Sequence, residues 1–211
     1  LKPKIQSIQR IFIMQKLTFP LRFTFKLLTP SNDFSVFDAD GNEVAYTRQR
    51  IFKIKEKIDI FQSSRSNILL YTIQADRIID FSATYSVCDA AGNKLGSVKR
   101  NGMKSLWKAS YTINDADGHP VYGLHESNPW TAVLDGLVGE IPVLGMLTGY
   151  FLNPSYIISA PDGREIFRLK KEASLFERKF SLYKTGEAGP EQDILALNAS
   201  MMLMLLERDK G

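Results

Sequence analysis

A turn that recurs four times constrains the fold of this chain most strongly. In each copy an apolar run ends in a short segment containing Asp, reaches a Gly and is followed by a new run; the glycines are Gly41, Gly92, Gly118 and Gly163. Asp accepts hydrogen bonds from nearby backbone N–H groups, and Gly supplies the positive φ that tight hairpins require. The turns therefore predict serial antiparallel hairpins, and their uneven spacing favours a meander over a solenoid.

The runs between these turns alternate between apolar and polar residues, which is typical of strands with one buried face. We find about twelve such runs between residues 18 and 183. So many strands must close or pair as two sheets, because long open edges aggregate. The clearest apolar faces consist of Leu21, Phe23, Phe25 and Leu27; Phe52, Ile54, Ile58 and Ile60; Phe81, Ala83, Tyr85 and Val87; and Trp107, Ala109, Tyr111 and Ile113.

The C-terminal segment has a different pattern. Pro190 and the acids that follow it favour a helix start, since Pro has a suitable φ and acids complement the helix dipole. Residues 194–206 are apolar on every side except at Asn198 and Ser200. A helix that is apolar all round must be buried all round. We therefore expect a central helix at about 191–207 threaded through a barrel; the alternatives are a helix packed on one sheet or at a dimer interface.

Together these patterns predict a mainly β protein: a closed antiparallel β-barrel of about twelve strands around a C-terminal hydrophobic central helix. With 44% hydrophobic and 24% charged residues, the chain can bury a full core. We expect residues 1–17 to form a basic N-terminal segment and residues 18–211 a single domain. Because the sequence begins at Leu1, we expect a fragment of a longer chain. The sequence contains no run of 18 apolar residues, so we expect no membrane-spanning helix.

The order of these features resembles the tubby C-terminal-like superfamily, especially its LURP-one-related and phospholipid-scramblase-like branches. The resemblance covers about residues 34–206. It depends on the Asp-Gly hairpins, on residues 92–100 leading into 105–113, and on the hydrophobic C-terminal helix. It implies a twelve-stranded barrel around a central helix, and association with membrane phospholipid or phosphoinositides. The palmitoylated Cys cluster of scramblases has no counterpart, since Cys88 is the only cysteine.

The sequence contains no catalytic or metal-binding motif, so we expect a protein that is not an enzyme and needs no cofactor or metal. The alternative is an enzyme that uses residues on the rim of the barrel. His119 and His125 are expected at the surface, about 20 Å apart along a strand. Residues 38–43 resemble part of an EF-hand loop, but Gly41 stands in the wrong position for calcium. We interpret them as a hairpin turn, and Cys88 as a buried or half-buried small residue.

Basic residues give one candidate binding surface. Lysines at alternate positions of one predicted strand face project at intervals of about 6.6 Å, a spacing that suits several phosphates. The alternative is a solvated strand face, because lysine rows also keep outer strands soluble. The anion- or lipid-binding candidates are Arg48, Arg50, Lys53, Lys55 and Lys57 in one cluster and Lys99, Arg100, Lys104 and Lys108 in a second.

An apolar insertion at about 128–153 breaks the strand pattern. It is rich in Gly, and Pro142 would break a continuous helix. One interpretation is a segment that folds over one end of the barrel and plugs it. The other is an exposed element that contacts a membrane or a partner protein. The candidates for that contact are Trp130, Leu137, Tyr150 and Phe151.

Two functions follow from these surfaces. The first is a non-enzymatic module that binds anionic phospholipid or phosphoinositide at a membrane surface, in the cytoplasm or peripheral to the membrane. The second is a structural or regulatory domain that uses the 128–153 insertion to bind a protein partner or to form a homo-oligomer. We expect no nucleic-acid binding, because the aromatic side chains alternate inward instead of lying among the basic ones.

Overall fold

A computed structural model describes residues 17–25, 33–47, 57–76, 83–101, 110–127, 155–172 and 179–208. These residues form twelve antiparallel strands and one helix. Each strand pairs with its neighbours in sequence, and β1 also pairs with β12, so the barrel is closed as predicted. The elements are β1 (Leu21–Phe25), β2 (Phe34–Phe37), β3 (Glu43–Thr47), β4 (Lys57–Phe61), β5 (Leu69–Ala75), β6 (Thr84–Asp89), β7 (Lys94–Asn101), β8 (Ser110–Asp115), β9 (Pro120–Glu126), β10 (Ser155–Ser159), β11 (Glu165–Glu172), β12 (Lys179–Lys184) and α4 (Pro190–Arg208).

The burial of the strands follows the predicted alternation. In β1, Leu21, Phe23 and Phe25 are buried whereas Arg22 is exposed. In β6, Tyr85 and Val87 are buried and the residues between them are half-buried. Since neighbouring residues of a strand point to opposite faces, each strand turns one apolar row inward. Burial of these rows is the main source of stability that the barrel wall contributes.

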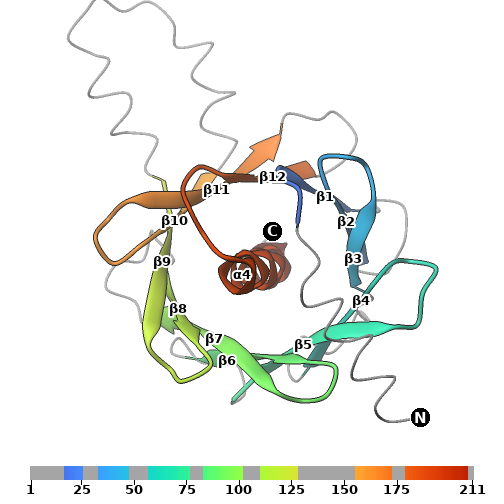
Figure 1. Cartoon of the computed structure of the whole chain (residues 1–211), viewed down its shortest axis with the longest axis horizontal. Helices are drawn as coiled ribbons and strands as arrows, with labels where there is room; N and C mark the ends of the chain where they lie inside the picture. Colours follow the sequence, from blue (N-terminus) through green and yellow to red (C-terminus); the bar gives the residue numbers. More distant parts are fainter. Residues whose placement is uncertain are drawn as a thin grey trace, which may run out of the picture.

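The helix α4 lies inside the ring of strands (Figure 1). Every residue from Asp193 to Leu205 is buried, as expected for a helix without a polar face. The prediction of a central helix is therefore confirmed. Close approach of the wall to α4 depends on Gly96 in β7, because a Cβ at this position would lie 2.7 Å from Leu195 Cδ2 of the helix.

The four predicted turns are present, and they share one geometry. Their glycines have φ values of 86°, 87°, 92° and 86°. In the first turn, the Gly41 N–H donates to the Asp38 carbonyl, and the Asp38 N–H donates to the Asn42 carbonyl. The Asp38 carboxylate accepts the Asn42 N–H at 2.8 Å. The turns around Gly92 and Gly118 repeat these three bonds.

The up-and-down order of the strands divides their connections between two ends of the barrel. We call one end the hairpin end; it contains connections 38–42, 62–68, 89–93, 115–119, 160–164 and 185–189 and the first turn of α4. The opposite end, which we call the loop end, contains the strand ends that flank residues 26–32, 48–56, 77–82, 102–109, 128–154 and 173–178. Within the described part of the chain, α4 does not have the length and hydropathy of a bilayer-crossing helix.

Candidate functional site

The structure describes three of the predicted site residues: Lys57, Lys99 and Arg100. The other predicted residues lie outside the described ranges. They are the basic candidates Arg48, Arg50, Lys53, Lys55, Lys104 and Lys108 and the apolar candidates Trp130, Leu137, Tyr150 and Phe151. The strand ends that flank all ten of these residues lie at the loop end.

Lys57 lies on the outer face of β4, where its ammonium is 3.2 Å from the carboxylate of Asp59. The two side chains are 50% and 42% exposed. An exposed pair of this kind contributes little stability. Lys57 is therefore exposed to solvent, as both interpretations of the lysine row require, and its charge is partly offset by Asp59.

Lys99 and Arg100 lie on opposite faces of β7. Lys99 pairs with Thr84 and Thr112 and is exposed on the outer face of the barrel. Arg100 pairs with Tyr111, whose side chain is buried in the core, so Arg100 faces inward and is half-buried. The two residues therefore do not share a surface, in contrast to the predicted second cluster, because successive strand residues alternate between faces.

Charge is distributed unevenly along the barrel axis. The connections of the hairpin end and the first turn of α4 contain nine Asp or Glu and two Arg, a net charge of −7. Residues 1–20, which lead into β1 at the same end, contain four Lys or Arg and no acid, so that the sequence joined to the hairpin end has a net charge of −3. The six segments whose flanking strand ends lie at the loop end contain nine Lys or Arg and five Asp or Glu, a net charge of +4. The charged residues of the hairpin end are Asp38, Asp40, Arg65, Asp89, Asp115, Asp117, Asp162, Arg164, Glu187, Glu191 and Asp193.

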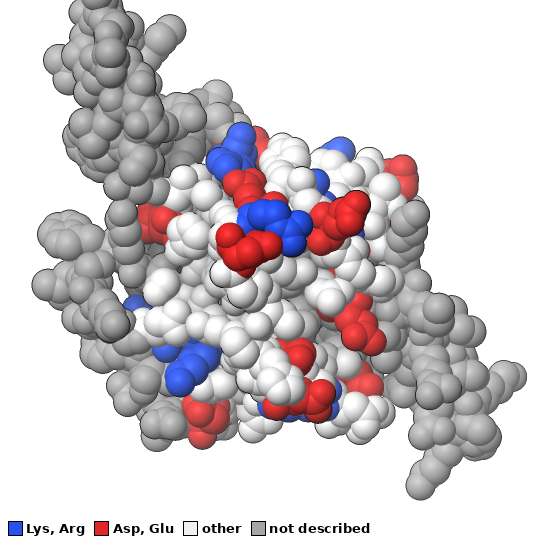
Figure 2. Space-filling model, turned by 60° about the vertical axis from the view of Figure 1, so that its left-hand side comes forward, with Lys and Arg blue, Asp and Glu red and all other residues white. Residues whose placement is uncertain are grey.

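The side of the barrel shown in Figure 2 has no extended area of one sign; acidic and basic side chains lie next to one another. Arg168 of β11 forms an ion pair with Glu165, and Arg164 forms one with Asp162 at 2.6 Å. These contacts lower the pKa of both carboxyl groups, chiefly through side-chain hydrogen bonds from the arginines. Pairs of this kind offset charge locally, both on the barrel wall at Arg168 and in the hairpin-end turn at Arg164.

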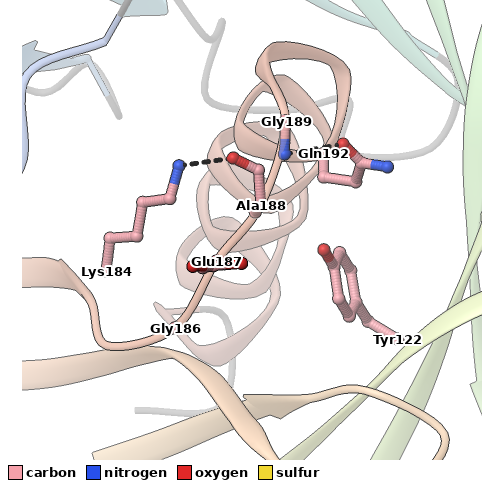
Figure 3. A pocket seen from close by; sticks show the side chains of 7 residues that line it. All are labelled: Tyr122, Lys184, Gly186, Glu187, Ala188, Gly189 and Gln192. Atoms are coloured by element: carbon pink, nitrogen blue, oxygen red, sulfur yellow. Dashed lines mark hydrogen bonds between the residues drawn. The ribbon is translucent and has the colours of Figure 1, made fainter.

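A cavity of about 680 Å³ opens beside the N-terminus of α4 (Figure 3). Lys184 and Tyr122 lie on opposite sides of it. The Lys184 ammonium is 2.7 and 2.9 Å from the two carboxylate oxygens of Asp193 and donates to the Ala188 carbonyl at 2.8 Å. The cavity is lined by Tyr122, Lys184, Gly186, Glu187, Ala188, Gly189 and Gln192.

The charged groups at this cavity, Lys184 and Asp193, form a structural ion pair. Burial raises the pKa of Asp193, and the hydrogen bond and charge of Lys184 oppose that shift. Burial also raises the pKa of the Tyr122 hydroxyl. Because Lys184 is occupied by Asp193 and the Ala188 carbonyl, it is not an available general base. The pair joins β12 to the start of α4.

Sequence reasoning missed Lys184, although a signal for it exists. The inward row of β12 is Phe180, Leu182 and Lys184, so period two places the lysine inside the barrel. A buried ammonium requires a partner. The sequence therefore predicts an acidic partner for Lys184, and the structure shows that, of Glu187, Glu191 and Asp193, this partner is Asp193.

One group of side chains in the hairpin end has the spacing of metal ligands. Ligand atoms of Asp115, Asp117 and His119 lie within 4.8 Å of one another. The Asp115 carboxylate already accepts the His119 N–H at 2.8 Å, and this backbone bond is the main cause that lowers its pKa. The His119 side chain is 78% exposed, and His125 is exposed on the outer face of β9. The histidines are therefore at the surface as expected, and turn geometry accounts for the cluster.

No protein-family model matches the sequence. Neither the curated proteins nor the solved structures include a significant match. The barrel with its central helix is the fold that the resemblance to the tubby C-terminal-like superfamily implies. A fold alone does not identify a family or an activity, so membership of that superfamily stays a prediction.

Proposed function

We propose that the protein is a non-enzymatic module that binds anionic phospholipid at a membrane surface through the loop end of its barrel. The observation that carries this proposal is the separation of charge between the two ends of the barrel, from −3 in the sequence joined to the hairpin end, residues 1–20 included, to +4 in the segments flanked by the loop end. A basic end with an acidic opposite end favours one orientation toward an anionic surface.

The filled interior supports an exterior binding surface. Ligand-carrying barrels keep a space between their strands, whereas α4 occupies the centre of this barrel. Within the described residues, the inner rows of the strands pack against α4, including Leu195 against the backbone of Gly96. A ligand would therefore bind at an end or on the outer wall.

Composition at the loop end combines the two contributions that membrane-surface binding needs. Each Lys or Arg near an anionic surface contributes about 1 kcal/mol. The apolar insertion at 128–153 follows β9 and precedes β10, and the flanking residues Glu126 and Ser155 lie at the loop end. Basic and apolar segments thus connect to the same end of the barrel, which supports combined electrostatic and apolar contact.

Co-sedimentation with vesicles tests this proposal. We expect the protein to sediment with phosphatidylserine-containing vesicles and not with pure phosphatidylcholine, and we expect salt to weaken the binding, since surface charges are screened. Exchange of Lys53 and Lys55 for Glu should weaken binding about 30-fold or more, from about 1 kcal/mol for each lysine.

A matched variant distinguishes the two ends. Arg65 and Lys94 are exposed residues at or beside hairpin-end turns, so Arg65→Glu with Lys94→Glu changes the net charge equally at the opposite end. Binding of this control should stay within about threefold of the parent, because a charge many Debye lengths away is screened. Equal losses in both variants would contradict binding through the loop end. Absence of sedimentation under all conditions would contradict lipid binding itself.

A further inference from the structure

We infer that the exposed acids of the hairpin end form a repulsive face that opposes the reversed orientation of the barrel on the membrane, so that the start of α4 is directed away from the lipid. This inference deepens the proposed function and rests on it. It concerns acids whose positions, exposure and partners the structure describes.

The acids of the turns at 38–42, 89–93 and 115–119 are of two kinds. Asp38, Asp89 and Asp115 add hydrogen bonds to their turns, since their carboxylates accept the N–H of Asn42, Asn93 and His119, each at 2.8 Å. These bonds close the turn beside the glycine. Replacing such an acid by a residue without a side-chain acceptor, such as Ala, would therefore change both local structure and charge.

Asp40 and Asp117 belong to the second kind. Both are exposed, and neither has an ion-pair partner among the residues that the structure describes. Ala91 occupies the same position in the turn around Gly92, which has the same backbone bonds: Gly92 N to Asp89 O at 3.0 Å and Asp89 N to Asn93 O at 2.9 Å. The turn therefore needs no acid at this position, and what Asp40 and Asp117 add is negative charge.

Distance separates the effects of the two ends. The 19 residues of α4 span about 28 Å at 1.5 Å per residue, and the screening length at physiological salt is about 8 Å. A membrane at the loop end is thus more than three screening lengths from the hairpin acids. These acids do not weaken binding in that orientation, but they oppose the reversed orientation, in which they would meet anionic lipid directly.

Fluorescence quenching by nitroxide-labelled lipid tests the orientation. Cys88 is the only cysteine, so Cys88→Ala permits single labels at Asn67→Cys in the hairpin end and at Asn101→Cys where β7 reaches the loop end. Both positions are exposed. On phosphatidylserine-containing vesicles we expect quenching at position 101 and none at position 67. Quenching at position 67 in sedimented protein would overturn the orientation and leave lipid binding standing, whereas failure to sediment would overturn both.

A charge variant tests the role of the two exposed acids. Asp40→Lys with Asp117→Lys raises the net charge of the hairpin end by four, and we expect the label at position 67 to become quenched while the bound fraction does not fall. The matched control adds four charges to the outer wall through Thr24→Lys, Thr72→Lys, Ser86→Lys and Thr112→Lys, and its label at position 67 should stay unquenched. Equal behaviour of the two variants would overturn the inference. A double variant, Asp40→Ala with Asp117→Ala, checks that the two acids are dispensable for folding. We expect its melting temperature to equal that of the parent protein.

Discussion

The barrel interior and the hairpin end constrain their residues in different ways. In the interior, a residue such as Leu195 is in contact with both its own helix and the barrel wall, so its size and polarity are both determined by packing. At the hairpin end, the turn determines the glycine but not the exposed residue before it, as Asp40 and Ala91 demonstrate. The charge of exposed residues at the hairpin end can therefore change without a change in the fold. A polar substitution in the barrel interior would disturb the packing.

Lys184→Met should have the largest effect of these substitutions on the free energy of unfolding. Lys184 lies where the barrel interior meets the hairpin end. It removes the cation beside Asp193, whose side chain is 9% exposed. Breaking a buried ion pair on one side costs about 3 kcal/mol. We expect a loss of this size in the free energy of unfolding at neutral pH, measured by chemical denaturation.

The pH dependence of the same variant follows from Asp193. Burial raises its folded-state pKa, and loss of Lys184 removes the opposing influence. A carboxyl whose folded pKa is raised binds a proton more tightly in the folded state, so stability falls as pH rises from the unfolded pKa through the folded one. The variant should therefore be closer to the parent near pH 4 than at pH 7. Lys184→Met combined with Asp193→Asn should recover part of the loss, and failure to recover would show that lysine packing, not charge, is responsible.

Gly96→Ala tests the close approach of wall and helix. The added Cβ would meet the Asn114 carbonyl oxygen and would lie 2.7 Å from Leu195 Cδ2. Overpacking of this kind costs about 2 kcal/mol. Gly123→Ala is the matched control, since the closest atom to its Cβ outside the adjacent residues would be the Ser159 hydroxyl oxygen, at 3.7 Å. Thermal unfolding of both variants should show a clear loss only at position 96; equal midpoints would contradict tight packing there.

Most of the fold could be predicted from the sequence because its signals are local. Turn chemistry at Gly41, Gly92, Gly118 and Gly163 and the period of two between them indicate serial hairpins, and the helix predicted at about 191–207 lies at Pro190–Arg208. The contact between Gly96 and Leu195 could not be predicted, because it depends on which strand faces which turn of the helix. That information is not local.

The candidate site was less predictable than the fold, because the neighbours of its side chains also depend on contacts that are not local in sequence. A group of nearby basic residues was interpreted as one cluster, although period two already separates Lys99 from Arg100. The acidity of the hairpin end could have been inferred from the sequence: in an up-and-down barrel every second connection lies at the same end, and the Asp-rich turns are those connections. The placement of Lys184 beside Asp193 required the three-dimensional structure to establish, since β12 and α4 meet only in the folded barrel.

Asp38→Ala and Asp40→Ala compare the two kinds of acid within one turn. Asp38 is buried and its carboxylate accepts both the Asn42 N–H and the Asn42 side-chain amide, at 2.8 and 3.0 Å. Loss of these bonds should cost about 1.5 kcal/mol, as for other hydrogen bonds to charged groups. Asp40→Ala should stay within about 0.5 kcal/mol of the parent, as is usual for exposed positions. Similar losses at both positions, measured by chemical denaturation, would contradict the division of these acids into two kinds.

Asp115→Asn should have the smallest effect and isolates charge from hydrogen bonding. Asn keeps an oxygen that can accept the His119 N–H, so the turn is retained and only the negative charge is lost. The backbone bond from His119 lowers the pKa of Asp115, and a carboxyl with a lowered folded pKa stabilises the protein above its unfolded pKa and loses that contribution as pH falls through the folded one. The small difference in melting temperature between parent and variant should therefore be present at neutral pH and disappear in acid. A difference that persists at low pH would mean that the amide disturbs the turn, and that hydrogen-bond geometry instead of charge makes Asp115 necessary.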